Sequence, residues 1–202
     1  MSRANASARI REKAGRPRQY DLQPLEGFAS EAVAWLAACL DELRERVEDQ
    51  IDDLTAADLG KVPSGVNFSI GALVKHLLWA ELGWIKRITG CEVPADLLDI
   101  VEESGQAVRD GHRAVVNLAP EALICLCRRV RDEVTVPALR MLDDIDVVTG
   151  PSSQPVTPRG VLMHLVWHWT YHSGQIGLLR ELLGYGYTWT LGPLTSRSTD
   201  SE

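Results

Sequence analysis

Residues 161–183, VLMHLVWHWTYHSGQIGLLRELL, contain three of the five histidines in the chain: His164, His168 and His172. Each of the three is four residues from the next. Four residues turn an α-helix about 40° beyond one full turn and advance about 6 Å along its axis. On a helix, all three imidazoles therefore share one face, which an ordinary packed core seldom requires. This stretch predicts a helix with a histidine-lined face.

Geometry limits how many of these histidines can bind one metal ion. His164 and His172 are about 12 Å apart along the helix axis, whereas a metal–nitrogen bond is about 2.1 Å long. One ion can bind only an adjacent pair, so a third ligand has to come from another segment. The alternative is that the three side chains line a packed face and are satisfied by hydrogen bonds to neighbours. Three imidazoles in register favour the metal site, because each one needs a partner when it is buried.

Two further histidines are available as the third ligand. His112 stands between Gly111 and Arg113 in a weakly patterned segment, where we expect it to be exposed to solvent. His76 lies in an apolar helical pattern, and the small residues Ala80 and Gly83 follow it by one and two turns. Small neighbours leave space for an approaching partner, so His76 is the better candidate.

Four long segments have the three- and four-residue spacing of apolar residues that is typical of amphipathic helices. Ser69 and Thr157 are typical N-cap residues, whereas Gly90 and Gly184 follow predicted helix ends. Pro137 is expected to kink the third helix. We expect the four helices at about residues 24–54, 70–88, 120–142 and 158–183.

The segment between the second and third helices is long and weakly patterned. We expect a short helix to begin near Leu97 and to be interrupted by Gly105 and Gly111. A connection of this length allows the flanking helices to run parallel, whereas short loops force antiparallel neighbours. The expected fold class is all-α: a four-helix bundle with a long connection between helices 2 and 3 and with cofactor sites among its inward-facing side chains.

Length and charge set the domain organisation. The 202 residues suffice for one domain with an ample core. Residues 1–19 contain six arginines and lysines and one acid, so they carry +5, and the net charge of −7 leaves −12 for the rest. An acidic body argues against nucleic acid as a partner. We expect a basic flexible arm at residues 1–19, a bundle domain at 20–192 and a flexible tail at 193–202.

Composition also indicates the compartment. No apolar run approaches the roughly 20 residues needed to cross a bilayer, and the N-terminal residues lack the apolar core of a secretory signal. Four cysteines without paired spacing favour reduced thiols over a disulfide framework, and Cys39, Cys125 and Cys127 are expected to pack as small hydrophobic residues. We expect a cytoplasmic protein without a membrane partner. The broad apolar arcs of its helices are compatible with a homodimer.

Two segments of the sequence resemble the DinB/YfiT-like superfamily of small helical-bundle proteins. They are residues 69–84, SIGALVKHLLWAELGW, and residues 164–184, HLVWHWTYHSGQIGLLRELLG. The resemblance extends over roughly residues 22–190 and implies a four-helix bundle in which a long link joins parallel second and third helices. One departure concerns Ser173, which stands where many members have a basic residue. A role of that basic residue in holding an acidic substrate is therefore not expected here.

The resemblance also implies a divalent metal ion held by three histidines, which correspond to His76, His168 and His172. His164 then becomes a pocket residue beside the ligands. Nitrogen-only ligation suits zinc, nickel, iron or copper, and we expect zinc or nickel. Some members of the superfamily transfer small thiols such as bacillithiol or mycothiol to electrophiles. The implied function is a metal-dependent thiol S-transferase, or a thiol-dependent detoxification enzyme in a stress response, acting on a small-molecule thiol and an electrophile.

Two other functions remain open at this point: a metal-dependent hydrolase, and a non-catalytic bundle that binds a metal or ligand. Glu81 lies about 140° around the helix from His76, so it is not expected to face the same ion. No other side chain presents itself as a general base. Gln175 is expected to orient a ligand or water, to cap a helix or to pack, and Tyr171 is expected to pack. The tryptophans beside the two motifs are expected in the core or lining a pocket: Trp79, Trp84, Trp167 and Trp169.

Overall fold

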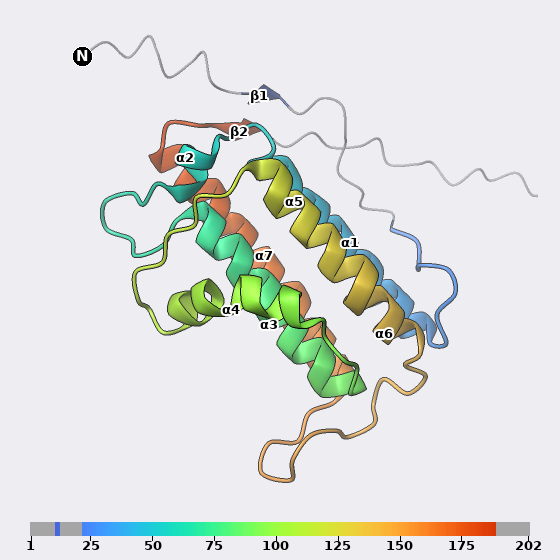
Figure 1. The fold of residues 1–202 in the computed structure, drawn as a ribbon. Coiled ribbons are helices and arrows are strands. Elements are labelled where there is room, and N and C mark those ends of the chain that lie inside the picture. Colours follow the sequence, from blue (N-terminus) through green and yellow to red (C-terminus); the bar gives the residue numbers. More distant parts are fainter. Residues whose placement is uncertain (1–10, 13–21, 189–202) are drawn as a thin grey trace, which may run out of the picture.

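Helices make up most of the described chain (Figure 1). The structure is a computed structural model that describes residues 11–12 and 22–188. The only strands in these residues are the two-residue β1 (Arg11–Glu12) and β2 (Tyr187–Thr188), which pair in parallel. The prediction of an all-α protein is confirmed. The helices are α1 (Glu31–Ile51), α2 (Ala56–Gly60), α3 (Ile70–Thr89), α4 (Ala95–Arg109), α5 (Pro120–Arg129), the π-helical segment η3 (Val130–Thr135), α6 (Val136–Arg140) and α7 (Pro158–Leu182).

Four long helical stretches lie side by side: α1, α3, α7 and the continuous stretch of α5, η3 and α6 (Figure 1). Their facing sides form one hydrophobic core, in which Val47, Leu77 and Leu165 are fully buried. Burying such a side chain contributes about 1.5–3 kcal/mol to stability. The connection from α3 to α5 contains α4, which packs mainly on α3.

The sequence signals at the ends of α3 and α7 hold in the structure. The side chain of Ser69 accepts a hydrogen bond from the backbone N–H of Ala72, and the side chain of Thr157 accepts one from Gly160. Each N-cap of this kind stabilises a helix by about 1 kcal/mol. Gly90 ends α3 in the left-handed conformation, with a φ of 70°. These ends fix the extent of both histidine-bearing helices.

Two predicted boundaries are wrong. The first helix begins at Glu31 rather than near residue 24, because Gly27 takes a positive φ of 78° that interrupts a helix. Helix α4 runs through Gly105 without interruption. Helix α3 packs closely against the chain at that glycine, and this tertiary contact outweighs the low helix propensity of the residue.

The third helical stretch departs from α-helical geometry earlier than the predicted kink. Its π-helical segment begins at Val130, and Pro137 follows it in the first turn of α6. Proline has no N–H for the carbonyl four residues before it, and its ring collides with that carbonyl. The wider turn that precedes Pro137 accommodates both the proline ring and the missing hydrogen bond. Within it, the N–H of Val136 donates to the carbonyl of Arg131, five residues before.

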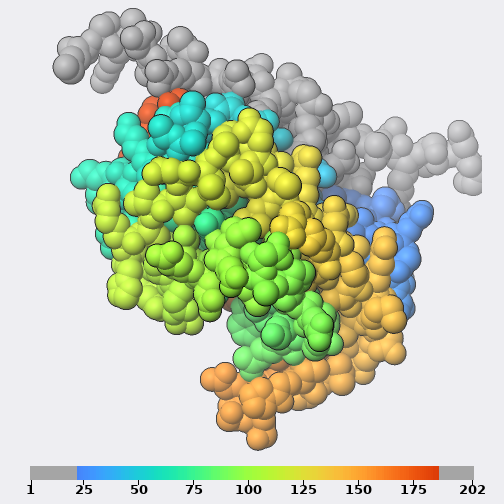
Figure 2. All heavy atoms as spheres, in the orientation of Figure 1, coloured from blue at the N-terminus to red at the C-terminus, as the bar shows by residue number. Residues whose placement is uncertain are grey.

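The surface view shows α4 over α3 and the loop of residues 143–157 projecting beyond the end of α3 (Figure 2). The expected basic arm and tail lie outside the described residues, except for Arg11 and Glu12. Within the described part of the chain, no helix combines the length and apolar composition that crossing a membrane requires.

Candidate metal centre

Three histidine side chains converge between α3 and α7. His76 comes from the middle of α3, and His168 and His172 come from successive turns of α7. The Nε2 atom of His168 lies 3.2 Å from that of His76 and 3.1 Å from that of His172. All three ligand atoms lie within 4.8 Å of one another. The structure therefore brings together the three residues that the family resemblance implied.

Hydrogen bonds on the far side of two rings determine which nitrogen is free. Nδ1 of His76 lies 2.9 Å from the backbone carbonyl oxygen of Gly105, and Nδ1 of His172 lies 2.6 Å from Oε1 of Gln175. A carbonyl or amide oxygen only accepts, so both Nδ1 atoms donate. In the neutral ring the lone pair is then on Nε2. Gln175 thus orients the ring of His172, one of the three converging histidines.

The three converging nitrogen atoms are better placed to bind a cation than to form hydrogen bonds with one another. With the lone pairs of His76 and His172 on Nε2, only His168 has a proton to share, and it can share it with one neighbour at a time. The Nδ1 atom of His168 is buried and has no hydrogen-bond partner among the described residues. Metal–nitrogen bonds of about 2.0–2.1 Å place tetrahedral ligand atoms about 3.3–3.4 Å apart, close to the 3.2 Å and 3.1 Å that separate Nε2 of His168 from those of His76 and His172. The residues fit a divalent ion.

Burial keeps the three rings neutral. Loss of water, together with smaller contributions from His172, His76 and His164, lowers the pKa of His168 to about 3. Burial likewise lowers the pKa of His172 to about 4, against the opposing effect of its bond to Gln175. The pKa of His76 is lowered by burial as well. Neutral imidazole is the form that binds metal ions, so the ligands need not lose protons at neutral pH.

Close packing of α4 on α3 positions His76. A Cβ atom placed on Gly105 would lie 2.5 Å from the Cβ of Trp79, so this position has room only for glycine. The Trp79 ring stacks on the His76 ring at a centroid distance of 5.9 Å. Sequence reasoning treated Gly105 as a helix interruption and missed this contact, because no local pattern indicates which helix approaches a glycine.

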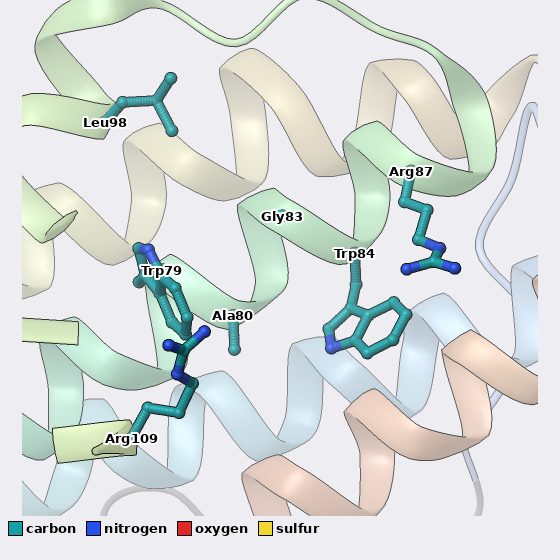
Figure 3. A pocket seen from close by; sticks show the side chains of 7 residues that line it. All are labelled: Trp79, Ala80, Gly83, Trp84, Arg87, Leu98 and Arg109. Carbon is teal, nitrogen blue, oxygen red and sulfur yellow. The ribbon is translucent and has the colours of Figure 1, made fainter. Parts of the chain in front are cut away.

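Trp84 lines two cavities, of which the second is also lined by a histidine. The first, of about 360 Å³, is bounded by α3 and α4 and includes Trp79 and Arg109 (Figure 3). The second, of about 530 Å³, lies between Trp84, the first turns of α7 and residues 148–157. The exposed His164 lines the second cavity, and its ring stacks on that of His168 at 5.6 Å.

The other residues named in the sequence analysis differ from one another in burial. Trp169 is buried, and Trp79 and Trp84 line a cavity. The expectation for Trp167 is wrong, because its side chain is 67% exposed on the outer face of α7. Tyr171 is 63% exposed, although its ring contacts that of His172 at a centroid distance of 5.0 Å. Apolar and aromatic residues on that face match a core pattern although nothing described covers them. Two smaller expectations have opposite outcomes: His112 is exposed as expected, and Cys125 is exposed rather than packed.

Glu81 faces the core and not the histidines, as its angular position on α3 predicts. Its carboxylate accepts hydrogen bonds from Arg44 at 2.6 Å, from Nε1 of Trp169 at 2.9 Å and from the hydroxyl of Thr135. Arg44 and Glu81 are almost completely buried. This network is a structural link between α1, η3, α3 and α7, and it contributes no group to the metal ligands.

Comparisons with known proteins agree with this arrangement. The model of a protein family described as mycothiol-S-transferase matches residues 35–184, a range that includes all three converging histidines. A solved structure of a DinB-like protein from Bacillus cereus ATCC 10987 is similar, with a TM-score of 0.53 and 20% sequence identity. The similarity covers 73% of this chain and 91% of that chain, and at this identity it bears on the fold alone. Among curated proteins, none matches the sequence.

Proposed function

This chain belongs to the mycothiol-S-transferase family, of the DinB/YfiT-like superfamily, and we propose that it transfers a small thiol to an electrophile using a divalent metal ion held by His76, His168 and His172. The observation that carries the proposal is the convergence of three imidazole nitrogens whose lone pairs have no better partner than a cation. A donor set of three nitrogens suits zinc or nickel.

Three protein ligands leave a coordination position open, as in catalytic zinc sites. A bound divalent ion supplies the positive charge that holds a thiol as its thiolate, the nucleophilic form. The chain supplies the rest: Gly105 and Gln175 hold two of the rings in place, and burial keeps the rings neutral. During transfer the sulfur donates an electron pair to the electrophilic carbon, the displaced group leaves with its bonding pair, and the thiol proton is released.

A transfer reaction needs space for two substrates. The two cavities that share Trp84 meet this requirement, since each is bounded by a ring that contacts a residue proposed to bind the metal ion. Trp79 stacks on His76 in the first cavity, and His164 stacks on His168 in the second. This arrangement supports a two-substrate reaction beside the metal ion.

Metal analysis and a thiol-dependence assay together test the proposal. We expect about one equivalent of zinc or nickel in the purified protein and its loss in His76→Ala and His168→Ala. His112→Ala is the matched control, because His112 is exposed and is not one of the three clustered histidines; this variant should retain the ion. The metal-loaded protein should consume an electrophile only when mycothiol or another small thiol is present. A wild-type protein that binds no divalent ion at equimolar concentration would contradict the proposal.

The same assay identifies the two alternatives. Hydrolysis of the electrophile at the same rate without thiol would indicate a metal-dependent hydrolase. A bound metal ion without turnover under either condition would indicate a non-catalytic metal-binding or ligand-binding bundle. Both results would leave the metal centre in place and reject thiol transfer.

A further inference from the structure

The cavity between α3 and α4 has two aromatic walls. Trp79 and Trp84 of α3 both line it, five residues apart, with Ala80 and Gly83 between them in the chain (Figure 3). Leu98 of α4 adds an apolar contact on the other side. Flat aromatic surfaces favour ligands that are themselves flat and largely apolar, because such ligands stack on them.

Two guanidinium groups lie at this cavity, each over one of the tryptophans. Arg87 lies over the Trp84 ring and Arg109 over the Trp79 ring, both at 5.4 Å from the centroid. No acidic side chain is among the described residues that line the cavity. In a chain with a net charge of −7, this is a local positive site. Such a site favours a ligand that carries an anion.

The two arginines differ in their existing partners. Arg109 forms an exposed ion pair with Asp110 at 3.0 Å. Arg87 has no carboxylate partner among the described residues, and its one hydrogen bond there runs from Nη2 to the backbone carbonyl of Gln154. A guanidinium has five N–H donors, so Arg87 retains donors for a ligand. Arg87 is therefore the better anchor for an anion.

Gly83 keeps the space between the two tryptophans empty. It lies inside α3, where glycine lowers helix stability relative to alanine. A Cβ atom at this position would meet no atom within 4 Å. Packing therefore does not require the glycine. Its effect is to leave the floor of the cavity open.

We propose that this cavity binds the electrophile and selects a flat, largely apolar molecule carrying a carboxylate or similar anion, which Arg87 anchors. Naming the occupant as the electrophile rests on the proposed thiol transfer. The class of ligand rests on the cavity alone. Trp79, which lines this cavity, also stacks on His76. A molecule bound in the cavity would therefore lie one aromatic ring away from a residue proposed to bind the metal ion.

Calorimetric titration with 2-naphthoate and with its neutral analogue 2-naphthamide tests this inference without requiring turnover. Wild-type protein should bind naphthoate more tightly than the amide. Arg87→Gln should weaken naphthoate binding roughly 10- to 100-fold, the effect of losing a charge-assisted hydrogen bond, and leave amide binding unchanged. Gly83→Leu fills the cavity and should abolish binding of both compounds.

Gly174→Leu is the matched control. Gly174 is also an exposed glycine inside a helix with no atom within 4 Å of an added Cβ, but it lies outside the cavity. This variant should bind naphthoate as the wild type does. Leucine is a better helix former than glycine, so neither substitution should unfold its helix.

A metal-deficient variant separates the two proposals. His168→Ala should lose the metal ion and thiol transfer but still bind naphthoate, because the carboxylate binds Arg87 and not the ion. Absence of naphthoate binding in the wild type, or equal binding by wild type, Arg87→Gln and Gly83→Leu, would overturn the cavity assignment even if thiol transfer is observed.

Discussion

Nδ1 of His76 lies 2.9 Å from the backbone carbonyl oxygen of Gly105, a residue 29 positions away on α4. This bond exists only because Gly105 lacks a side chain, since an added Cβ would lie 2.5 Å from the Cβ of Trp79. One glycine therefore sets both the distance between two helices and the orientation of a proposed metal ligand.

Gly105→Ala is expected to damage the fold and the metal centre together. Overpacking against Trp79 should lower the free energy of unfolding by about 1–3 kcal/mol. The displaced α4 should release the His76 ring and weaken metal binding. Urea unfolding and a metal titration measure the two effects. Gly174→Ala is the control, because its Cβ would meet nothing within 4 Å. An unchanged metal affinity in Gly105→Ala would show that the carbonyl does not position His76.

Gln175→Ala is expected to weaken metal binding without unfolding the protein. Its Oε1 atom accepts the hydrogen bond from His172 Nδ1 at 2.6 Å. Removing such a partner of a metal-binding histidine typically lowers metal affinity about 10- to 100-fold. Competition with a chromophoric chelator measures this. Tyr171→Phe removes only the hydroxyl that accepts a hydrogen bond from Gln175 Nε2, so it should bind metal normally. An equal loss of metal affinity in Gln175→Ala and Tyr171→Phe would contradict the role of Gln175 in positioning His172.

The metal-free protein is expected to lose stability as the pH falls below about 6.5, the ordinary pKa of histidine. Burial lowers the pKa of His168 to about 3 and that of His172 to about 4 in the folded state. Between these values and 6.5 the unfolded chain binds more protons than the folded chain, so the free energy of unfolding rises with pH. His168→Gln should flatten this dependence in urea unfolding of chelator-treated protein. Parallel pH profiles for both proteins would refute the explanation.

The buried ion pair of Arg44 and Glu81 is expected to be strongly coupled to folding. Arg44→Met leaves a buried carboxylate with Thr135 and Trp169 as its neutral partners, and breaking a buried pair in this way costs about 3–5 kcal/mol. Urea unfolding measures the loss. Arg159→Met breaks an exposed pair with Asp146 and should change stability much less. Equal effects of the two substitutions would contradict the role of burial.

Local signals predicted the parts of this structure that depend on nearby residues. Ser69, Gly90 and Thr157 delimit their helices because a cap acts within one turn. Likewise, the four-residue spacing of His168 and His172 places two side chains on one face of α7, which helix geometry dictates.

Contacts between distant residues account for what the sequence did not indicate. His76 and His168 are 92 residues apart. The sequence made His76 the better of two candidates for the third ligand, and only the family resemblance implied the full set of His76, His168 and His172. The partnership of His76 with Gly105 likewise depends on how α4 lies on α3. Trp167 and Tyr171 have an apolar or aromatic character that predicts packing, but their face of α7 is open among the described residues. Composition alone does not tell which side of a helix is covered.

Helix α4 packs closely on α3 but buries few of its own side chains. Only Leu97, Val101 and Gly105 of its 15 residues are buried, and segments with few buried apolar residues open locally at a lower free energy than the core. Helix α4 holds His76 through Gly105 and borders the cavity through Arg109. A local opening of α4 would therefore release the ring of His76 and widen the cavity at the same time. Amide hydrogen exchange should therefore be faster in α4 than in α3. The lifetime of a bound ion and the entry of a ligand would then depend on the same local equilibrium.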